Sequence, residues 1–163
     1  RAAEDARFAN VVCSEEIEPL GTGGALANAE SLIGSEHFFV ANGDTLSAID
    51  LNALYDFHSA RGAMISLAVS AVGDAASAGN VMVDEAKKIT GFREKEGGFT
   101  GFVNAGTYLM HRSVLAHMPR GMFSIETDFF PKMVGKVPMY AFLTDSSFLD
   151  IGTPERYESA NKN

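Results

Sequence analysis

The chain contains 163 residues, which suits one domain with a substantial core, because most domains contain about 50 to 250 residues. Hydrophobic residues make up 46% of it and charged residues 21%, and these values exclude the composition of a disordered protein. The formal net charge of −8 argues against a nucleic-acid-binding protein, since binding to a phosphate backbone needs clustered Lys and Arg.

The location and organisation of the protein are predicted from what the sequence lacks. No apolar run approaches the roughly 20 residues of a membrane span, and no signal peptide opens the chain. The single cysteine, Cys13, excludes an internal disulfide framework. We therefore expect a cytoplasmic protein with no membrane partner. No repeat or low-complexity linker interrupts the sequence, which predicts a single domain over residues 1–163.

The first half of the chain predicts strands alternating with helices. The continuous apolar run at 37–41 is typical of a strand that is covered on both faces of a parallel sheet. A helix is predicted over 51–61, because Asp50 is a favourable N-cap and Gly62 lies just past the end. The other predictions here are a short strand at 11–14, a helix at 23–33 that stops at Gly34, and a buried strand at 64–69.

The second half continues this alternation. Thr153 followed by Pro154 predicts the start of the last helix, since Pro suits the first helical position. This order of elements indicates an α/β domain with a mostly parallel, mixed sheet. The predicted elements are two short strands within 81–92, a strand at 105–110, helical segments near 112–117 and 125–133, and a strand at 139–143.

A glycine-rich segment, PLGTGGA at 19–25, lies between a predicted strand and a predicted helix. Gly21, Gly23 and Gly24 let the backbone approach a ligand closely, and a helix N-terminus offers free N–H groups. The segment is neither a Walker A loop nor a dinucleotide fingerprint, because no Gly-Lys-Ser/Thr follows and Leu26 replaces the third glycine. A tight turn from strand to helix would explain the same pattern.

Two acidic residues follow predicted strands. Asp44 comes after the apolar run, in ANGDT at 41–45, and Asp150 ends FLD shortly before the last helix. In open α/β sheets ligands bind at the carboxyl ends of strands, where a carboxylate can hold a cation that bridges phosphate oxygens. Each residue also has a simpler explanation: Asn-Gly-Asp is typical of a turn, and an acidic residue is favourable near a helix N-terminus.

A charged segment, FREK at 92–95, precedes two glycines. Lys95 can neutralise a sugar phosphate and Glu94 can hydrogen-bond hydroxyls, although a solvated run of charges is the simpler explanation. The four histidines show no spacing typical of a metal site, so we expect them to be surface or structural residues.

The order of these segments resembles the NDP-sugar pyrophosphorylase family, the sugar-1-phosphate nucleotidyltransferases. The resemblance runs from about Pro19 to Ala160 and is greatest to guanylyltransferases that act on mannose-type and D-glycero-D-manno-heptose 1-phosphates. It implies a Rossmann-like three-layer α/β sandwich related to the GT-A fold. The segments that carry it are PLGTGGA, ANGD, AGNVMVD, FREK, FVNAGTYLM, FSIETDFFP and FLDIGTPERY.

The resemblance also implies an activity and a role for each matching residue. The sugar phosphate would attack the α-phosphorus of a nucleoside triphosphate in line, giving an NDP-sugar and pyrophosphate without a covalent intermediate. Asp44, Lys95 and Asp150 would be catalytic, with Asp44 and Asp150 on Mg²⁺. The nucleotide would contact Gly21, Thr22, Gly23, Gly24 and Asp44. The sugar phosphate would contact Gly79, Glu94, Lys95, Asn104, Gly106 and Glu126.

One departure from the family is large. The family's opening strand and its Gly-Gly-x-Gly-Thr-Arg-Leu loop, which embraces the triphosphate, do not occur in this sequence. We therefore expect an N-terminally truncated domain that is inactive as it stands, with an exposed sheet edge that favours a homo-oligomer. Two alternatives remain: a non-catalytic nucleotide-sugar-binding regulatory module of the same fold, and a nucleotide-sugar-dependent glycosyltransferase, for which Asn42 departs from the expected Asp-x-Asp.

Overall fold

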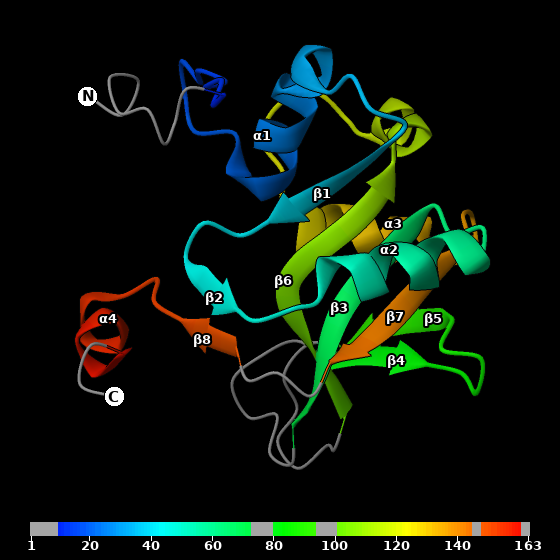
Figure 1. Cartoon of the computed structure of the whole chain (residues 1–163). Helices are drawn as coiled ribbons and strands as arrows, with labels where there is room; N and C mark the ends of the chain where they lie inside the picture. The colour runs from blue at the N-terminus through cyan, green and yellow to red at the C-terminus, as the bar shows by residue number, and fades with distance from the viewer. Residues whose placement is uncertain (1–9, 73–79, 94–100, 145–147, 161–163) are drawn as a thin grey trace.

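The computed structural model describes residues 10–72, 80–93, 101–144 and 148–160 (Figure 1). Its main sheet has the strand order β5-β4-β6-β3-β7, and β1 also pairs with β6. A second, two-stranded sheet joins β2 to β8. The strands are β1 His37–Ala41, β2 Thr45–Ser47, β3 Ile65–Val72, β4 Asn80–Val83, β5 Ile89–Arg93, β6 Gly101–His111, β7 Met139–Thr144 and β8 Phe148–Asp150.

The sheet is mixed because the central strand β6 runs against its neighbours. It pairs antiparallel with β1, β3 and β4, whereas β3 and β7 pair in parallel. Strands β1, β3 and β7 therefore share one direction, as expected of an α/β sheet, but β6 separates β1 from β3. The predicted strand at 37–41 is confirmed as β1. The expected parallel pairing and burial on both faces are not found: in the described residues β1 pairs only with β6, antiparallel, and its side chains are half-buried or exposed.

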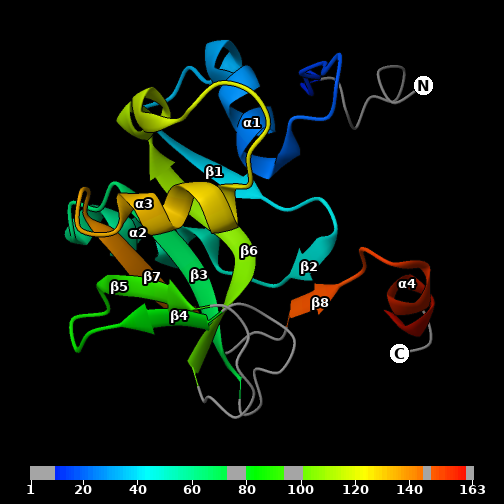
Figure 2. The same cartoon turned by 180° about the vertical axis from the view of Figure 1, so that it is seen from behind.

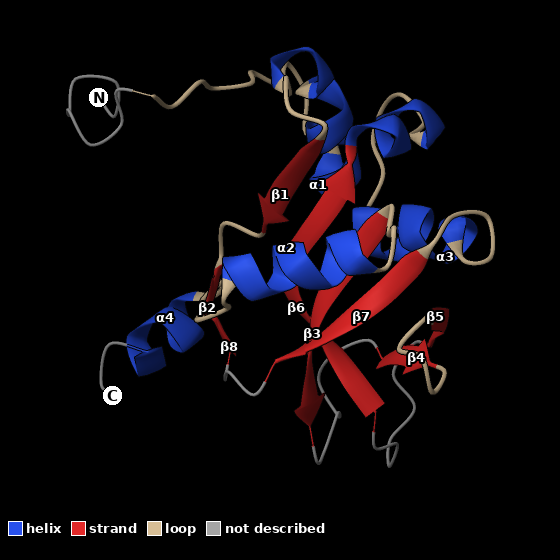
Figure 3. Ribbon diagram, turned by 45° about the vertical axis from the view of Figure 1, so that its right-hand side comes forward, coloured by secondary structure: helices blue, strands red, loops and turns tan. Residues whose placement is uncertain are grey.

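Helices cover both faces of this sheet. Helix α2 (Leu51–Ala60) packs over β3 and β7 on one face, and α3 (Phe130–Met133) lies on the other, as the opposite views in Figures 1 and 2 show. Figure 3 shows α2 crossing in front of the strands. The three-layer α/β architecture predicted from the sequence is thus confirmed. The remaining helices are α1 (Gly21–Asn28), α4 (Pro154–Ala160) and the short turns η3 (Glu30–Leu32), η4 (Arg112–His117) and η5 (Ile125–Phe129).

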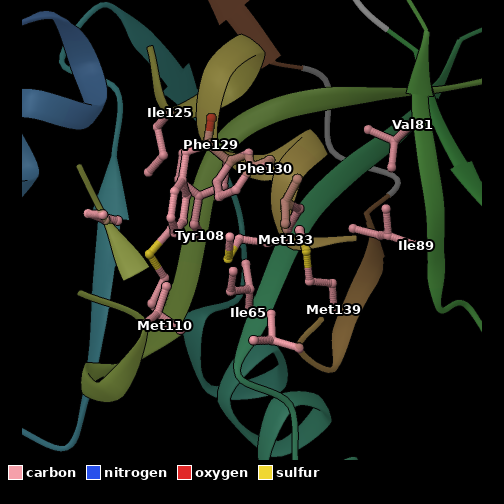
Figure 4. Packing of buried hydrophobic residues seen from close by; sticks show 14 of the residues in the cluster. Ile65, Val81, Ile89, Tyr108, Met110, Ile125, Phe129, Phe130, Met133 and Met139 are labelled. Carbon is pink, nitrogen blue, oxygen red and sulfur yellow. The ribbon is translucent and has the colours of Figure 1, made fainter. Parts of the chain in front are cut away.

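The core fills the space between the sheet and the η5–α3 segment. Phe129 and Phe130 are almost fully buried, and the ring of Phe130 meets that of Tyr108 edge-on at 5.0 Å between centroids (Figure 4). Ile65 from β3 and Met139 from β7 complete this layer. Because η5 continues directly into α3, burial of the two phenylalanines fixes the position of the polar residues that precede them.

Two predictions at the N-terminal end need correction. Residues 11–14 form no strand in the described part of the chain, and Val11 and Val12 are exposed, because no strand lies beside them to complete a ladder. The helix predicted over 23–33 begins two residues earlier and ends at Asn28, where a short 3₁₀ turn takes over. No described helix has both the length and the apolar character needed to cross a membrane.

Helix α2 begins as the sequence predicts. The carboxylate of Asp50 accepts hydrogen bonds from the backbone N–H groups of Asn52 and Ala53, and Gly62 adopts a φ of +53° after the last turn. Replacing Asp50 by Ala leaves these two N–H groups without their cap. We expect the free energy of unfolding to fall by about 1 kcal/mol in a urea titration. The exposed Asp56 of the same helix is the control, and an equal loss in Asp56→Ala would contradict the capping role.

Candidate functional site

Two of the predicted segments meet at a bend in β6. Leu67 of β3 pairs with Tyr108, but Val69 pairs with Asn104, so the irregularity in β6 lies at 105–107. Gly106 stands at its centre with a φ of +70°, a conformation that favours glycine. Its carbonyl accepts a hydrogen bond of 2.9 Å from the N–H of Asn42, which joins the ANGD segment to the NAG segment.

Gly106 is also required by close packing. A Cβ atom at this position would lie 3.2 Å from Nδ2 and 3.3 Å from Cβ of Asn42. The left-handed φ and the nearby Asn42 side chain both disfavour any larger residue. Gly106, which the resemblance assigned only to sugar binding, is therefore also needed for the bend in β6 beside Asn104.

A directed chain of hydrogen bonds starts at this bend. The N–H of Gly106 donates to Oδ1 of Asn104 at 3.0 Å, and Nδ2 of Asn104 donates to the Tyr108 hydroxyl at 2.8 Å. The Tyr108 hydroxyl in turn donates to Oε1 of Glu126 at 3.2 Å. Asn104 and Tyr108 each accept one hydrogen bond and donate another, while Gly106 only donates and Glu126 only accepts, so the direction of every bond in the chain is fixed.

The carboxylate of Glu126 receives two further donors on its other oxygen. The hydroxyl of Thr22 lies 2.7 Å from Oε2, and the hydroxyl of Ser124 lies 2.9 Å from the same atom. The Thr22 hydroxyl also accepts a hydrogen bond of 2.9 Å from the N–H of Ile125. The glycine-rich segment is thereby bonded to the beginning of η5. Four predicted site residues belong to one network: Thr22, Asn104, Gly106 and Glu126.

Tyr108 links Asn104 to Glu126 from a buried position in the core. Its ring is fully buried, and burial raises the pKa of its hydroxyl far above the ordinary value. The negative charge of Glu126 raises it further, while the hydrogen bond from Asn104 lowers it. Tyr108 is therefore a permanent donor to Glu126. This role was not predicted from the sequence, although the hydroxyl of a buried tyrosine usually has a hydrogen-bond partner.

The glycines of the segment PLGTGGA pack against the 121–125 stretch. Gly23 and Gly24 are buried, and their N–H groups both donate to the carbonyl of Phe123, at 3.0 and 3.3 Å. An added Cβ on Gly24 would lie 2.3 Å from the carbonyl oxygen of Gly121. These two glycines thus let α1 pack closely against residues 121–125. Gly21 and Thr22, at the beginning of α1, are exposed.

The two acidic residues predicted to bind metal are brought together by the small sheet. Thr45 of β2 is the antiparallel partner of Asp150 in β8, and the N–H of Ile151 donates to the carbonyl of Asp44 at 2.8 Å. The backbones of Asp44 and Asp150 thus lie at the same end of the β2–β8 ribbon although 106 positions separate the two residues in sequence. The other three predicted residues, Gly79, Glu94 and Lys95, lie outside the described residues.

A cluster of histidines lies at the opposite end of β1 from Asp44. The ring of His37 is 5.2 Å from that of His58 and 5.0 Å from that of His111, and all three line a cavity of about 440 Å³. His58 is fully buried, with Nδ1 2.9 Å from the Ser66 hydroxyl and with no partner for Nε2 among the described residues. Burial, and then the charges of His37 and His111, lower the pKa of His58 to about 4.

Comparison with known proteins assigns this arrangement to a family. The nucleotidyl transferase family model matches residues 2–163. The chain belongs to the nucleotidyl transferase family. This membership confirms the resemblance that the order of the seven segments indicated.

Named nucleotidyl transferases of two kinds are similar to the chain. It is 38% identical over 146 residues to a mannose-1-phosphate guanylyltransferase of Mycobacterium tuberculosis, covering 87% of this chain and 41% of that protein. It is 33% identical over 150 residues to a D-glycero-alpha-D-manno-heptose 1-phosphate guanylyltransferase of Aneurinibacillus thermoaerophilus, covering 91% and 65%. The chain therefore spans less than two thirds of the length of these relatives.

A protein of known structure has the same fold. The crystal structure of HddC from Yersinia pseudotuberculosis superposes with a TM-score of 0.78 at 35% identity, covering 90% of this chain and 64% of HddC. A second crystal structure of HddC, complexed with GMP-PN, gives a TM-score of 0.77. The mixed α/β fold described above is thus shared with HddC.

Proposed function

We propose that the full-length protein transfers a nucleoside monophosphate from a nucleoside triphosphate to a sugar 1-phosphate and releases pyrophosphate. The observation that carries this proposal is the hydrogen-bonded network that joins Asn104 and Glu126 to Thr22. It brings residues assigned to the sugar and a residue assigned to the nucleotide to one place. GTP and a mannose- or heptose-type 1-phosphate are the proposed substrates, on the strength of the names of the similar proteins.

The sugar side of the site is proposed to use polar groups that the fold already holds in place. Asn104 and Glu126 offer an amide and a carboxylate, which suit the hydroxyl groups of a sugar. Gly106 lets the backbone bend beside them. Gly79 and Glu94 are proposed to contact the sugar as well, and Lys95 is proposed to bind its phosphate. Such prearranged groups lower the entropic cost of orienting the attacking oxygen.

The nucleotide side is proposed to be formed by the beginning of α1. Gly21 and Thr22 are its exposed residues, whereas Gly23 and Gly24 contribute by the close packing of α1 against Phe123. Exposed backbone at a helix N-terminus can hydrogen-bond the edge of a base without any side chain. A bulky residue in place of Gly23 or Gly24 would therefore displace the beginning of α1 from residues 121–125.

The metal side is proposed to consist of Asp44 and Asp150. The backbones of the two residues meet at one end of the β2–β8 ribbon, where the N–H of Ile151 donates to the carbonyl of Asp44. Carboxylate oxygens are ligands that Mg²⁺ accepts. A bound Mg²⁺ neutralises charge on the triphosphate during transfer. The exposed position of Asp44 leaves its carboxylate accessible to a ligand, and its nearest side-chain donor, the Thr45 hydroxyl, is 3.5 Å away.

A matrix of substrates tests the proposed function directly. The full-length protein is incubated with each of the common nucleoside triphosphates and with mannose, glucose and heptose 1-phosphates, with Mg²⁺ present, while pyrophosphate release is followed. We expect release to require both substrates and to be fastest with GTP and a mannose-type or heptose 1-phosphate. Absence of release with every pair would overturn the proposal in favour of a binding module.

A further inference from the structure

The hydroxyl of Thr22 is fully engaged on the sugar side of the site. Its single proton points to Oε2 of Glu126 at 2.7 Å, and one of its acceptor positions receives the N–H of Ile125. A threonine hydroxyl has only one proton to donate. In this arrangement it cannot also donate to an acceptor on a nucleobase, although the residue belongs to the segment assigned to the nucleotide.

The carboxylate of Glu126 depends on Thr22 for its orientation. A carboxylate has about four acceptor positions, and three are filled by Thr22, Ser124 and Tyr108. Ser124 is only two residues away and moves with Glu126, whereas Thr22 stands on a different helix. Oε2 therefore already carries two donors, and Oε1 keeps the acceptor position that a ligand hydroxyl can use.

The contact between Thr22 and Glu126 is rigid because several hydrogen bonds join α1 to residues 121–125. Besides the two bonds of Thr22, the N–H groups of Gly23 and Gly24 donate to the carbonyl of Phe123. The N–H of Phe123 donates to the carbonyl of Leu20 at 3.0 Å. A displacement of the beginning of α1 therefore displaces the support of Glu126 as well.

From this geometry we propose that Thr22 is a positioning residue for the sugar phosphate: it holds the carboxylate of Glu126 toward the sugar and couples it to the nucleotide segment. This proposal rests on the proposed function above. Thr22 acts through Glu126 and does not contact the reacting atoms. Loss of its hydroxyl therefore weakens use of the sugar phosphate and leaves binding of the nucleotide alone unchanged.

Two variants of the full-length protein separate this role from a base contact. Thr22→Val keeps the branched shape and removes the hydroxyl, while Thr22→Ser keeps the hydroxyl. For Thr22→Val we expect kcat/KM for the sugar 1-phosphate to fall about 10- to 100-fold, the range for losing a hydrogen bond to a charged group. For Thr22→Ser we expect a value within about 3-fold of the wild type, since the donor is restored. The nucleotide Kd, measured by calorimetry without sugar, should stay within about 2-fold in both variants.

Thr127 provides the matched control. Its side chain is exposed on η5, close to Glu126 in sequence, and its hydroxyl makes no hydrogen bond within the described part of the chain. Thr127→Val should leave both constants unchanged. A weaker nucleotide Kd in Thr22→Val, with sugar-phosphate use intact, would overturn the proposal and identify a base contact. Unchanged constants in Thr22→Val would overturn it as well.

A structural readout keeps the proposal testable if the wild type releases no pyrophosphate, which would refute the proposed function separately. Crystal structures of the two Thr22 variants without ligand report the position of the Glu126 carboxylate. We expect it to rotate away from α1 in Thr22→Val and to keep its place in Thr22→Ser. An unmoved carboxylate in Thr22→Val would show that Ser124 and Tyr108 suffice to hold it.

Discussion

Replacement of Asp44 by Asn in the full-length protein should lower kcat for pyrophosphate release at least about 100-fold, because a metal that neutralises transferring phosphate contributes several kcal/mol. Asn keeps the size of the side chain and is equally suited to the turn that follows β1. The thermal midpoint should therefore stay unchanged. Chelation of divalent cations should abolish the activity of the wild type in the same assay.

The exposed Asp56 on α2 is the matched control for this loss. Asp56→Asn makes the same change of charge outside the β2–β8 ribbon and should retain full activity. Comparable turnover by Asp44→Asn and the wild type would contradict the metal role of Asp44. Equal losses in both variants would point to net charge in place of a specific ligand.

Acidification should destabilise the fold through His58, with an expected loss of about 3 kcal/mol between pH 7.5 and pH 4 from this residue. The pKa of His58 lies at about 4 in the folded protein and at 6.5 in the unfolded chain. The unfolded chain therefore takes up the proton first, so this stability is complete above pH 6.5 and is lost as the pH falls toward 4. Urea titrations across this range measure the slope.

His58→Asn removes the titrating group and can keep the bond to the Ser66 hydroxyl. It lowers stability at every pH, but we expect the acid slope to be smaller than that of the wild type. Glu36, His37, His111 and Tyr55 lie around His58 or its histidine neighbours and are retained in both proteins. The exposed His117, changed to Asn, should leave the slope unaltered. Equal slopes in His58→Asn and the wild type would contradict the assignment.

Features with a local cause could be predicted from the sequence. The start of α2 depends on Asp50 and the residues immediately after it, and the start of α4 depends on Thr153 and Pro154. The two short strands within 81–92 are confirmed as β4 and β5 for the same reason, since one turn joins them. In each case the deciding contact spans a few positions of the chain.

Features with a distant cause were wrong or missed. The strand predicted at 11–14 depended on a partner that the described structure does not place beside it. The hydrogen bond from Thr22 to Glu126 spans 104 positions, and nothing near Thr22 in sequence indicates it. Membership of the family predicted that both residues belong to the site. Their contact with each other, through the hydroxyl of Thr22, came only from the fold.

The direction of the hydrogen bonds from Gly106 through Asn104 and Tyr108 to Glu126 determines which polar groups on the proposed sugar side stay available to a ligand. Among the described residues, Asn104 keeps one N–H and one acceptor position on Oδ1, and Oε1 of Glu126 keeps one acceptor position, after the hydrogen bonds of the network are counted. A spare donor and spare acceptors in one network suit the hydroxyl groups of a ligand, since each hydroxyl can give and receive one bond. We therefore expect a sugar with two adjacent hydroxyl groups to use both kinds of position, whereas a deoxy sugar would leave one of them unsatisfied, so the proposed sugar side would discriminate by hydroxylation pattern.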